Sequence, residues 1–195
     1  MKIQYIESFF LENGGLVETK QLKGAGFTHY QLNNLISTGQ VVKVKQGLYK
    51  WNDSDQDELG MVARIVTQGI CCLFTACRHY ELTTFVSSEY HLAIPKKSKV
   101  VLPDYPPVKL YYWDETSYAT GITQITSNGF TIPIYDVEKT VCDMIRLRNK
   151  VGIDTVKEVM EAYLARKDRN LVKLSNYARA LGIGTYISNS LSLLL

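Results

Sequence analysis

The sequence has little of what builds membrane-bound or secreted proteins. It contains no apolar run near the roughly 18–20 residues that a transmembrane helix requires. Its N-terminus holds Glu7 and Glu12 and lacks a long apolar segment followed by a small-residue cleavage site, so we expect no signal peptide. Of the 195 residues, 46% are hydrophobic and 21% are charged, as is usual in globular chains. We therefore expect a cytoplasmic protein of one large or two modest domains.

Cysteine and histidine are scarce, with four and three residues, and their spacing matches no common metal site. Three of the cysteines lie in the apolar run of residues 69–77, and no CxxC…CxxC or CxxC…HxxxH pattern occurs. We expect reduced, buried thiols and no metal or cofactor. The motifs G-x-S-x-G, G-x-G-x-x-G, H-E-x-x-H and the P-loop are absent as well, which predicts a protein without enzymatic activity.

The net charge of +3 is small, but the charges are unevenly placed. Residues 1–52 hold six lysines and three glutamates, residues 53–138 hold six basic and eleven acidic residues, and residues 139–195 hold ten basic and five acidic residues. A basic segment at each end of the chain predicts two surfaces that bind a polyanion.

The first forty residues show three short helical patterns. Apolar residues recur at helical spacing over residues 3–11 and stop at an Asn-Gly-Gly sequence. A short helix over residues 19–23 ends at a Gly-Ala-Gly turn, which is typical of a helix-turn-helix. Thr28 and Gln31 form a T-x-x-Q capping box, which predicts a third helix that begins at His29.

The outward face of this third helix is polar and carries no acid. Tyr30, Asn33 and Asn34 recur there at helical spacing. An asparagine can bind adenine in the major groove with two hydrogen bonds, which contribute about 1–3 kcal/mol of discrimination. We expect these three side chains to read bases, while Thr28 and His29 contact phosphates at the start of the helix.

A basic hairpin is predicted over residues 41–51. Valines alternate there with Lys43 and Lys45, which predicts that both lysines share the solvent face, and Gln46 begins the turn. We expect Lys43, Lys45 and Gln46 to contact the phosphate backbone. Three helices followed by such a hairpin predict a winged helix-turn-helix DNA-binding domain over residues 1–52. Because winged helices also bind proteins, a protein-interaction module without DNA binding stays open.

The remaining residues 53–195 predict a mixed α/β domain that ends in several helices, and hence an α+β fold class for the chain. Strands are expected at residues 91–94 and 108–112. A hairpin with an Asn-Gly turn is expected over residues 122–134, and Pro133 would place its returning strand at a sheet edge.

Basic side chains of this second part predict a further surface for an anion, either DNA or an acidic partner. The candidates follow a strand or lie on the first C-terminal helix, and are Lys96, Lys97, Lys99, Lys139, Arg146 and Arg148. Solvated helix faces account for such charges more simply, and both interpretations stay open.

A metal-dependent nuclease is the remaining alternative. Such sites often place an acid two residues before a lysine, but Val137 occupies that position before Lys139. Asp136 and Glu138 stand at the start of a predicted helix, where capping and the helix dipole account for both acids.

The chain resembles the AbiEi antitoxins of the type IV, abortive-infection toxin–antitoxin systems. The N-terminal match is GAGFTHYQLNNLISTGQVVKVKQGLYKW, and the C-terminal matches are SSEYHLAIPKK, YDVEKTVCDMIRLRNKVG and EVMEAYLARKDRNLVKLSNYARALGI. Within the third of these four segments, Glu138-Lys139-Thr140-x-x-Asp143 resembles the acid–base–Thr–x–x–Asp pattern of the family. Gln46, in the N-terminal match, departs from the family, because relatives more often carry Arg at that position.

The resemblance implies a two-domain protein with two activities. An N-terminal winged helix would bind inverted repeats in its own promoter and repress the operon. A C-terminal domain would counteract a nucleotidyltransferase-like toxin, without forming a stable complex with it.

Overall fold

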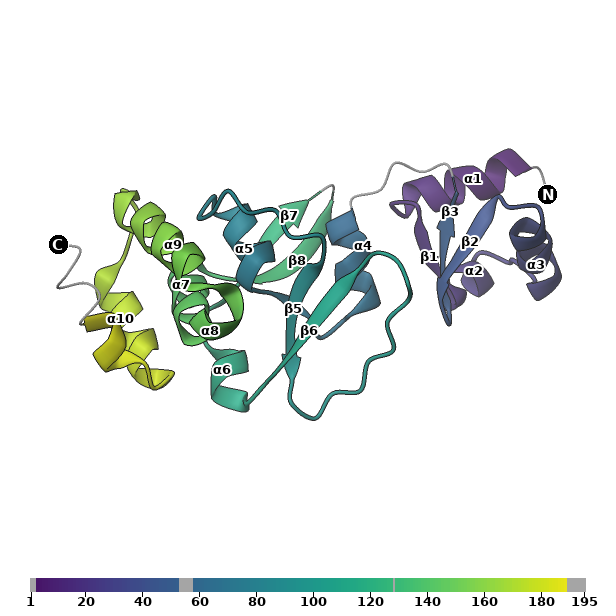
Figure 1. Ribbon diagram of the computed structural model, residues 1–195. Coiled ribbons are helices and arrows are strands. Elements are labelled where there is room, and N and C mark those ends of the chain that lie inside the picture. Colours follow the sequence, from purple (N-terminus) through teal and green to yellow (C-terminus); the bar gives the residue numbers. More distant parts are fainter. Residues whose placement is uncertain (1–2, 53–57, 128, 189–195) are drawn as a thin grey trace. The chain divides into compact units, whose positions relative to one another are not determined.

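The computed structural model describes residues 3–52, 58–127 and 129–188 of the chain (Figure 1). Asn128, on which the predicted Asn-Gly turn rests, lies outside the described residues. The chain divides into two compact units, each described here by itself. The first unit comprises Met1–Thr67, Val100–Pro106 and Thr126–Thr131, and the second comprises Gln68–Lys99, Pro107–Ile125 and Ile132–Leu195.

The first unit alternates short helices with a small antiparallel sheet. Its elements in chain order are α1 (Ile3–Glu12), β1 (Leu16–Glu18), α2 (Thr19–Gly24), α3 (His29–Ser37), β2 (Val41–Lys45), β3 (Leu48–Trp51) and α4 (Glu58–Ile65). The strands pair in the order β1-β3-β2 (Figure 1). The three predicted helices and the hairpin are confirmed. Strand β1 was not predicted, because three residues are too few to show an alternating pattern.

One hydrophobic cluster joins these helices to one face of the sheet. Phe10 of α1, Leu32 and Leu35 of α3, Val17 of β1 and Trp51 of β3 are all almost fully buried in it. Burial of a side chain of this size contributes about 1.5–3 kcal/mol. The cluster therefore holds α3 against the sheet with its polar face turned to solvent.

The pairing of β2 with β3 differs from the simple alternation predicted for the hairpin. Lys43 pairs with Tyr49, but the register shifts after it, so that Lys45 pairs with Leu48. Cross-strand partners share a face of the sheet and neighbours along a strand do not, so Lys43 and Lys45 lie on opposite faces. The prediction that both lysines share the solvent face is wrong, because the register shift inserts a residue between them.

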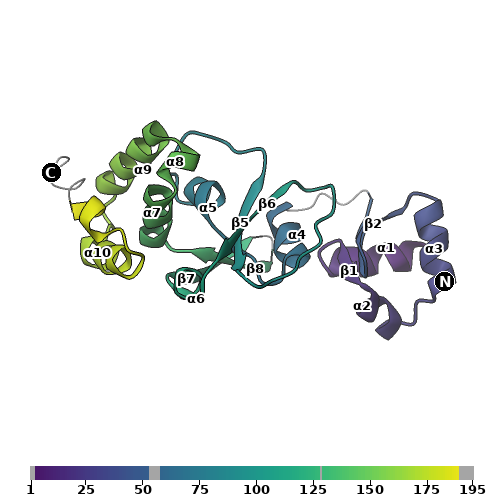
Figure 2. The same cartoon turned by 60° about the horizontal axis from the view of Figure 1, so that its bottom comes forward.

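The other elements build a five-stranded mixed sheet and a group of helices. In chain order they are β4 (Ile70–Cys71), α5 (Leu73–His79), β5 (Tyr90–Pro95), β6 (Val108–Trp113), α6 (Glu115–Ala119), β7 (Ile122–Ser127), β8 (Phe130–Tyr135), α7 (Val137–Arg146), α8 (Arg148–Val151), α9 (Ile153–Ala165) and α10 (Leu171–Ala180). Helices α7 to α10 gather on one side of the strands (Figure 2). Helix α7 packs against α5, α9 and α10, and its residues from Val137 to Ile145 are buried. The mixed α/β class is confirmed.

Pro133 does not mark a sheet edge. The strand order is β6-β5-β4-β8-β7, so β8 is an inner strand. Strand β4 has only two residues, and it meets β8 at the single pair Cys71–Ile134. The prediction of an edge strand is wrong, because the short neighbour does not extend to Pro133 and demands no hydrogen bond from it.

Two further expectations concern thiols and membranes. All four cysteines are free and buried, as predicted. Within the described parts of the chain, no helix is both long and apolar enough to cross a bilayer.

Candidate nucleic-acid interface

The polar face of α3 presents the side chains that were predicted to read bases. Tyr30 is 83% exposed, and Asn33 and Asn34 are exposed on the same helix. Neither asparagine amide has a hydrogen-bond partner among the described residues. The donors and acceptors of both amides are therefore available to a ligand.

The start of α3 is held by the predicted capping box. Thr28 Oγ1 accepts the N–H of Gln31 at 3.3 Å, and Gln31 Oε1 accepts the N–H of Thr28 at 2.9 Å. The Thr28 hydroxyl thus has a structural role besides the predicted phosphate contact. His29, the first residue of α3, is exposed.

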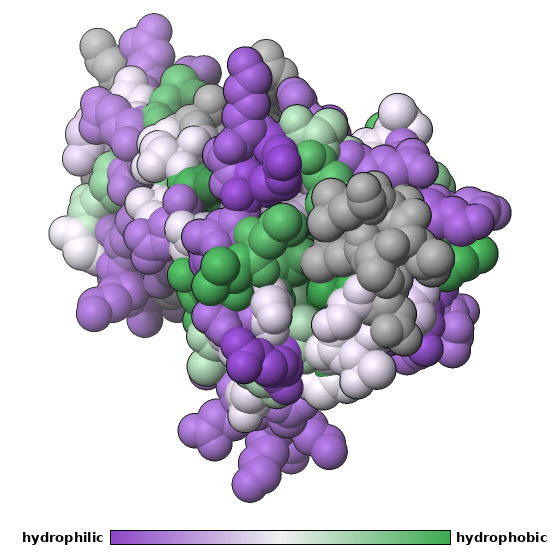
Figure 3. Space-filling model, turned by 90° about the vertical axis from the view of Figure 1, so that its left-hand side faces the viewer, coloured by the Kyte–Doolittle hydropathy of each residue, from purple (hydrophilic) through white to green (hydrophobic). Residues whose placement is uncertain are grey.

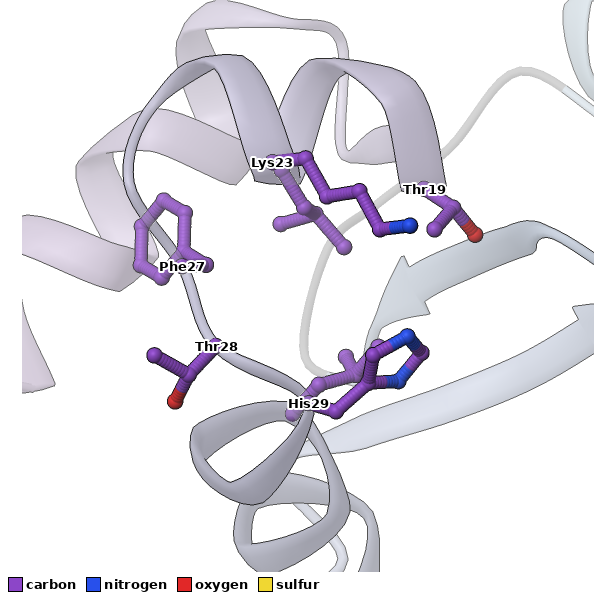
Figure 4. A pocket seen from close by; sticks show the side chains of 7 residues that line it. Thr19, Lys23, Phe27, Thr28 and His29 are labelled. Atoms are coloured by element: carbon purple, nitrogen blue, oxygen red, sulfur yellow. The ribbon is translucent and has the colours of Figure 1, made fainter.

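A shallow cleft separates α2 from the start of α3 (Figure 4). It is lined by Thr19, Leu22, Lys23, Phe27, Thr28, His29 and Leu32. Lys23 and His29 point into the same opening from the two helices (Figure 4). Lys23 forms no ion pair in the described part of the chain. The sequence interpretation did not include Lys23 among its candidate residues, although a lysine in the last turn of the helix before the Gly-Ala-Gly turn was the available signal.

The β2–β3 hairpin carries two exposed polar side chains that were predicted to contact phosphates. Lys43 and Gln46 are exposed, and within the described residues Lys43 forms no ion pair. The N–H of Thr19 donates to the carbonyl of Gly47 at 2.9 Å, so the turn lies beside the start of α2. The predicted phosphate contacts at the turn and at α3 therefore flank the same cleft.

Lys45 differs from the other predicted contacts, because its ammonium group is already bound. Its Nζ donates to the carbonyl of Ile65 at 2.7 Å. Ile65 is the last residue of α4, where carbonyl groups have no partner within the helix. The Lys45 ammonium group is therefore bound to the protein itself.

The second predicted anionic surface divides into buried and exposed parts. Lys139 is completely buried, so its assignment to this surface is wrong. Arg146 is paired with Asp143, and the Arg148 guanidinium lies over the Tyr186 ring at 4.5 Å. The three lysines that follow β5 are exposed, namely Lys96, Lys97 and Lys99.

Lys139 is buried against two aromatic rings, which stack on each other with centroids 5.2 Å apart. Its Nζ lies 4.0 Å from the centroid of Trp113 and 4.2 Å from that of Tyr135, and it pairs with Asp143 at 2.5 Å. Burial lowers the pKa of Lys139, against the attraction of Asp143. Burial also raises the pKa of Asp143 to about 6, against the attraction of Lys139 and Arg146.

The other members of the Glu-Lys-Thr-x-x-Asp pattern are buried as well. Glu138 accepts hydrogen bonds from Tyr163 and from the N–H of Asn170, and Thr140 donates to the carbonyl of Asp136. The pattern therefore ties α7 to its neighbours, and sequence reasoning could not distinguish this role from a surface role.

Asp136, the acid of the nuclease alternative, is fully engaged. Its Oδ1 accepts the N–H of Lys139 at 2.8 Å and so caps α7. Its Oδ2 lies 3.1 Å from Lys173 Nζ and accepts the Tyr177 hydroxyl at 3.0 Å. Among the described residues, no group of three or more His, Cys, Asp and Glu side chains is placed to bind a metal ion.

Helices α1, α2 and α3 of the first unit, with the turn between α2 and the capped α3, form the arrangement typical of a helix-turn-helix. Residues 4–49 match the sequence model of the family described as "Transcriptional regulator, AbiEi antitoxin". The predicted resemblance to AbiEi antitoxins is confirmed over this segment of the chain. A search of curated proteins finds no match.

One solved structure extends the likeness to the rest of the fold. The crystal structure of the RV2827C protein from Mycobacterium tuberculosis is similar, with a TM-score of 0.50 and 12% sequence identity. The alignment covers 93% of this chain and 77% of that one. At this identity the likeness shows the fold alone.

Proposed function

We propose that this protein is a DNA-binding autorepressor and antitoxin of a type IV toxin–antitoxin system. Residues 1–52 would form a winged helix-turn-helix domain, with the β2–β3 hairpin as the wing, that binds inverted repeats in its own promoter. Residues 53–195 would form an antitoxin domain that counteracts a nucleotidyltransferase-like toxin without a stable complex. The protein would act in the cytoplasm, in abortive infection by phage, and without catalysis.

The exposed face of α3 is the observation that carries the DNA-binding proposal. Tyr30, Asn33 and Asn34 are exposed without an acid beside them on this face. Lys23 and His29 at the cleft, with Lys43 and Gln46 on the hairpin, place further phosphate contacts around the same helix. The family match over residues 4–49 supports the same assignment.

The second unit contributes to DNA binding in this proposal through the three lysines that follow β5. Lys96, Lys97 and Lys99 are exposed and form no ion pair in the described part of the chain. Phosphate contacts of this kind raise the affinity for any DNA sequence and make it depend on salt.

A gel-shift assay on the DNA upstream of the gene, compared with a scrambled duplex, tests the assignment. Asn33→Ala and Asn34→Ala should each reduce the preference for the upstream DNA about tenfold, because each removes a base contact. Lys43→Ala should weaken both duplexes equally and reduce the salt slope by about 1. Asn149→Ala, an exposed asparagine of the second unit, is the matched control. Unchanged binding in all three test variants would exclude the assignment.

A protein-interaction module is the second candidate, and an apolar surface favours it. Hydrophobic residues gather in the middle of the face on the side of α9 and α10 (Figure 3). In these two helices the exposed large apolar side chains are Ile153 and Val172, which are 48% and 73% exposed. A contiguous exposed apolar patch is typical of a contact with another protein. Absence of DNA binding at low salt, with copurification of a partner, would favour this candidate.

A further inference from the structure

The small sheet of the first unit has a back face, opposite the face that packs on α1, α2 and α3. This back face is also covered by other parts of the protein. Leu16 and Leu48, which lie on the opposite face from the buried Tyr49, are only 1% and 2% exposed. Lys45 shares this back face with Leu48, and its Nζ donates to the carbonyl of Ile65 at the end of α4. The C-terminal end of α4 therefore lies behind the β2–β3 hairpin.

Arg64 of α4 reaches the first strand and the second helix. Its guanidinium donates to the carbonyl of Leu16 at 2.5 Å and to Gln21 Oε1 at 3.3 Å. Gln21 Oε1 also accepts the N–H of Glu18, which closes the capping box of α2. One turn of α4 thus contacts the hairpin through Lys45, and β1 and α2 through Arg64.

The Phe130 ring packs against both α4 and the turn that follows α1. A Cβ atom built on Gly14 would lie 2.4 Å from Phe130 Cζ, and one built on Gly60 of α4 would lie 2.6 Å from Phe130 Cδ2. Real Cβ atoms do not approach carbon so closely, so the ring fits only where both positions are glycine. The Arg64 guanidinium lies over the same ring, 6.0 Å from its centroid.

We propose that α4 braces the DNA-binding elements, with Lys45, Arg64 and Phe130 as positioning residues that fix the hairpin relative to α2 and α3. This inference rests on the proposed function. A protein that contacts one duplex with a helix and a hairpin loses less entropy on binding when their spacing is already fixed. Lys45 then serves DNA binding from the back of the sheet, without contacting a phosphate.

Two lysines of the same strand provide the test. Lys43→Met should reduce the slope of log affinity against log salt by about 1, because a phosphate contact is lost. Lys45→Met should leave the slope unchanged. It should also weaken binding and speed hydrogen exchange in the hairpin amides, each about tenfold, because a charged hydrogen bond is lost. The proposal would be overturned if Lys45→Met reduced the salt slope as much as Lys43→Met does and left hydrogen exchange of the hairpin amides unchanged.

The Phe130 contact can be tested from both sides. Phe130→Ala should speed hairpin exchange, whereas Phe85→Ala, at an exposed phenylalanine of the second unit, should not. Gly60→Ala should speed hydrogen exchange of the hairpin amides as much as Phe130→Ala does. The hairpin amides of the double variant should exchange no faster than those of either single variant, because both substitutions remove the same contact between Phe130 and Gly60. Additive effects, or none from Phe130→Ala, would refute the brace.

The brace and the proposed function can fail separately. If the wild-type protein binds no DNA at low salt, the proposed function fails. Hydrogen exchange in full-length Lys45→Met and Phe130→Ala still decides whether α4 holds the hairpin.

Discussion

Replacing Lys139 or Asp143 singly should destabilise the fold far more than replacing both. The two side chains are completely buried and paired at 2.5 Å on one turn of α7. Burial is the largest influence on both pKa values, lowering that of Lys139 and raising that of Asp143, so desolvation outweighs the mutual attraction. A buried pair of this kind is not expected to stabilise the fold relative to an apolar pair.

The size of the effect depends on which charge is left behind. Lys139→Met leaves the Asp143 carboxylate buried, and among the described residues its remaining cationic partner is Arg146, at 3.4 Å. Removal of one partner of a buried ion pair costs about 3–5 kcal/mol. Proton uptake by Asp143 would limit this loss, since the neutral acid tolerates burial better. The double variant Lys139→Met/Asp143→Leu should be within about 1 kcal/mol of wild type, because it leaves no ion from the pair.

Denaturant unfolding of the wild type, both single variants and the double variant forms a complete cycle. The surface pair Lys157–Asp154 is the matched control, since it also lies on one helical turn but is 69% and 95% exposed. Lys157→Met should cost less than about 1 kcal/mol. Single variants as stable as this control, or a double variant as unstable as the sum of the singles, would refute the argument from desolvation.

Two further predictions concern capping and pH. Thr28→Ala should lower the free energy of unfolding by about 1 kcal/mol, because the α3 cap is lost; denaturant unfolding that shows a variant as stable as wild type would contradict this. Burial, aided by Lys109, lowers the pKa of His91 to about 4, so its contribution to stability should be lost as pH falls from about 6.5 towards 4. Thermal melts of wild type and His91→Gln should show a smaller acid-side loss in the variant; parallel curves would contradict this.

Local signals explain why the helices of the first unit could be predicted. Helix α3 begins at His29 because the Thr28–Gln31 box satisfies the first N–H groups, and both residues lie within one turn of the boundary. Helix α1 likewise ends beside the Asn-Gly-Gly turn that stops its periodicity. Interactions between residues so close in the chain are visible in the sequence itself.

Burial of charge could not be predicted in the same way. Nothing in the residues next to Lys139 in the sequence distinguishes it from a lysine on a helix surface. Its burial depends on contacts with Trp113 and Asp143 in the folded protein. The role of Lys45 depends on the register shift in β2 and on the end of α4. Both facts arise from partners that the sequence does not place, so counting basic residues overstated the charge available to DNA.

The free charge of the first unit sets an upper limit on its salt dependence. Its described lysines without an ion pair or a hydrogen-bonded ammonium are Lys20, Lys23, Lys43 and Lys50, and Lys2 lies outside the described residues. If all four lysines and Lys2 contacted phosphates, the five contacts would give a salt slope of about −4.5 for each bound protomer, since each contact contributes about −0.9. A steeper slope requires cations of the second unit. In that case, replacing Lys96, Lys97 and Lys99 together should reduce it by about 2.7, and an unchanged slope would exclude them from the interface.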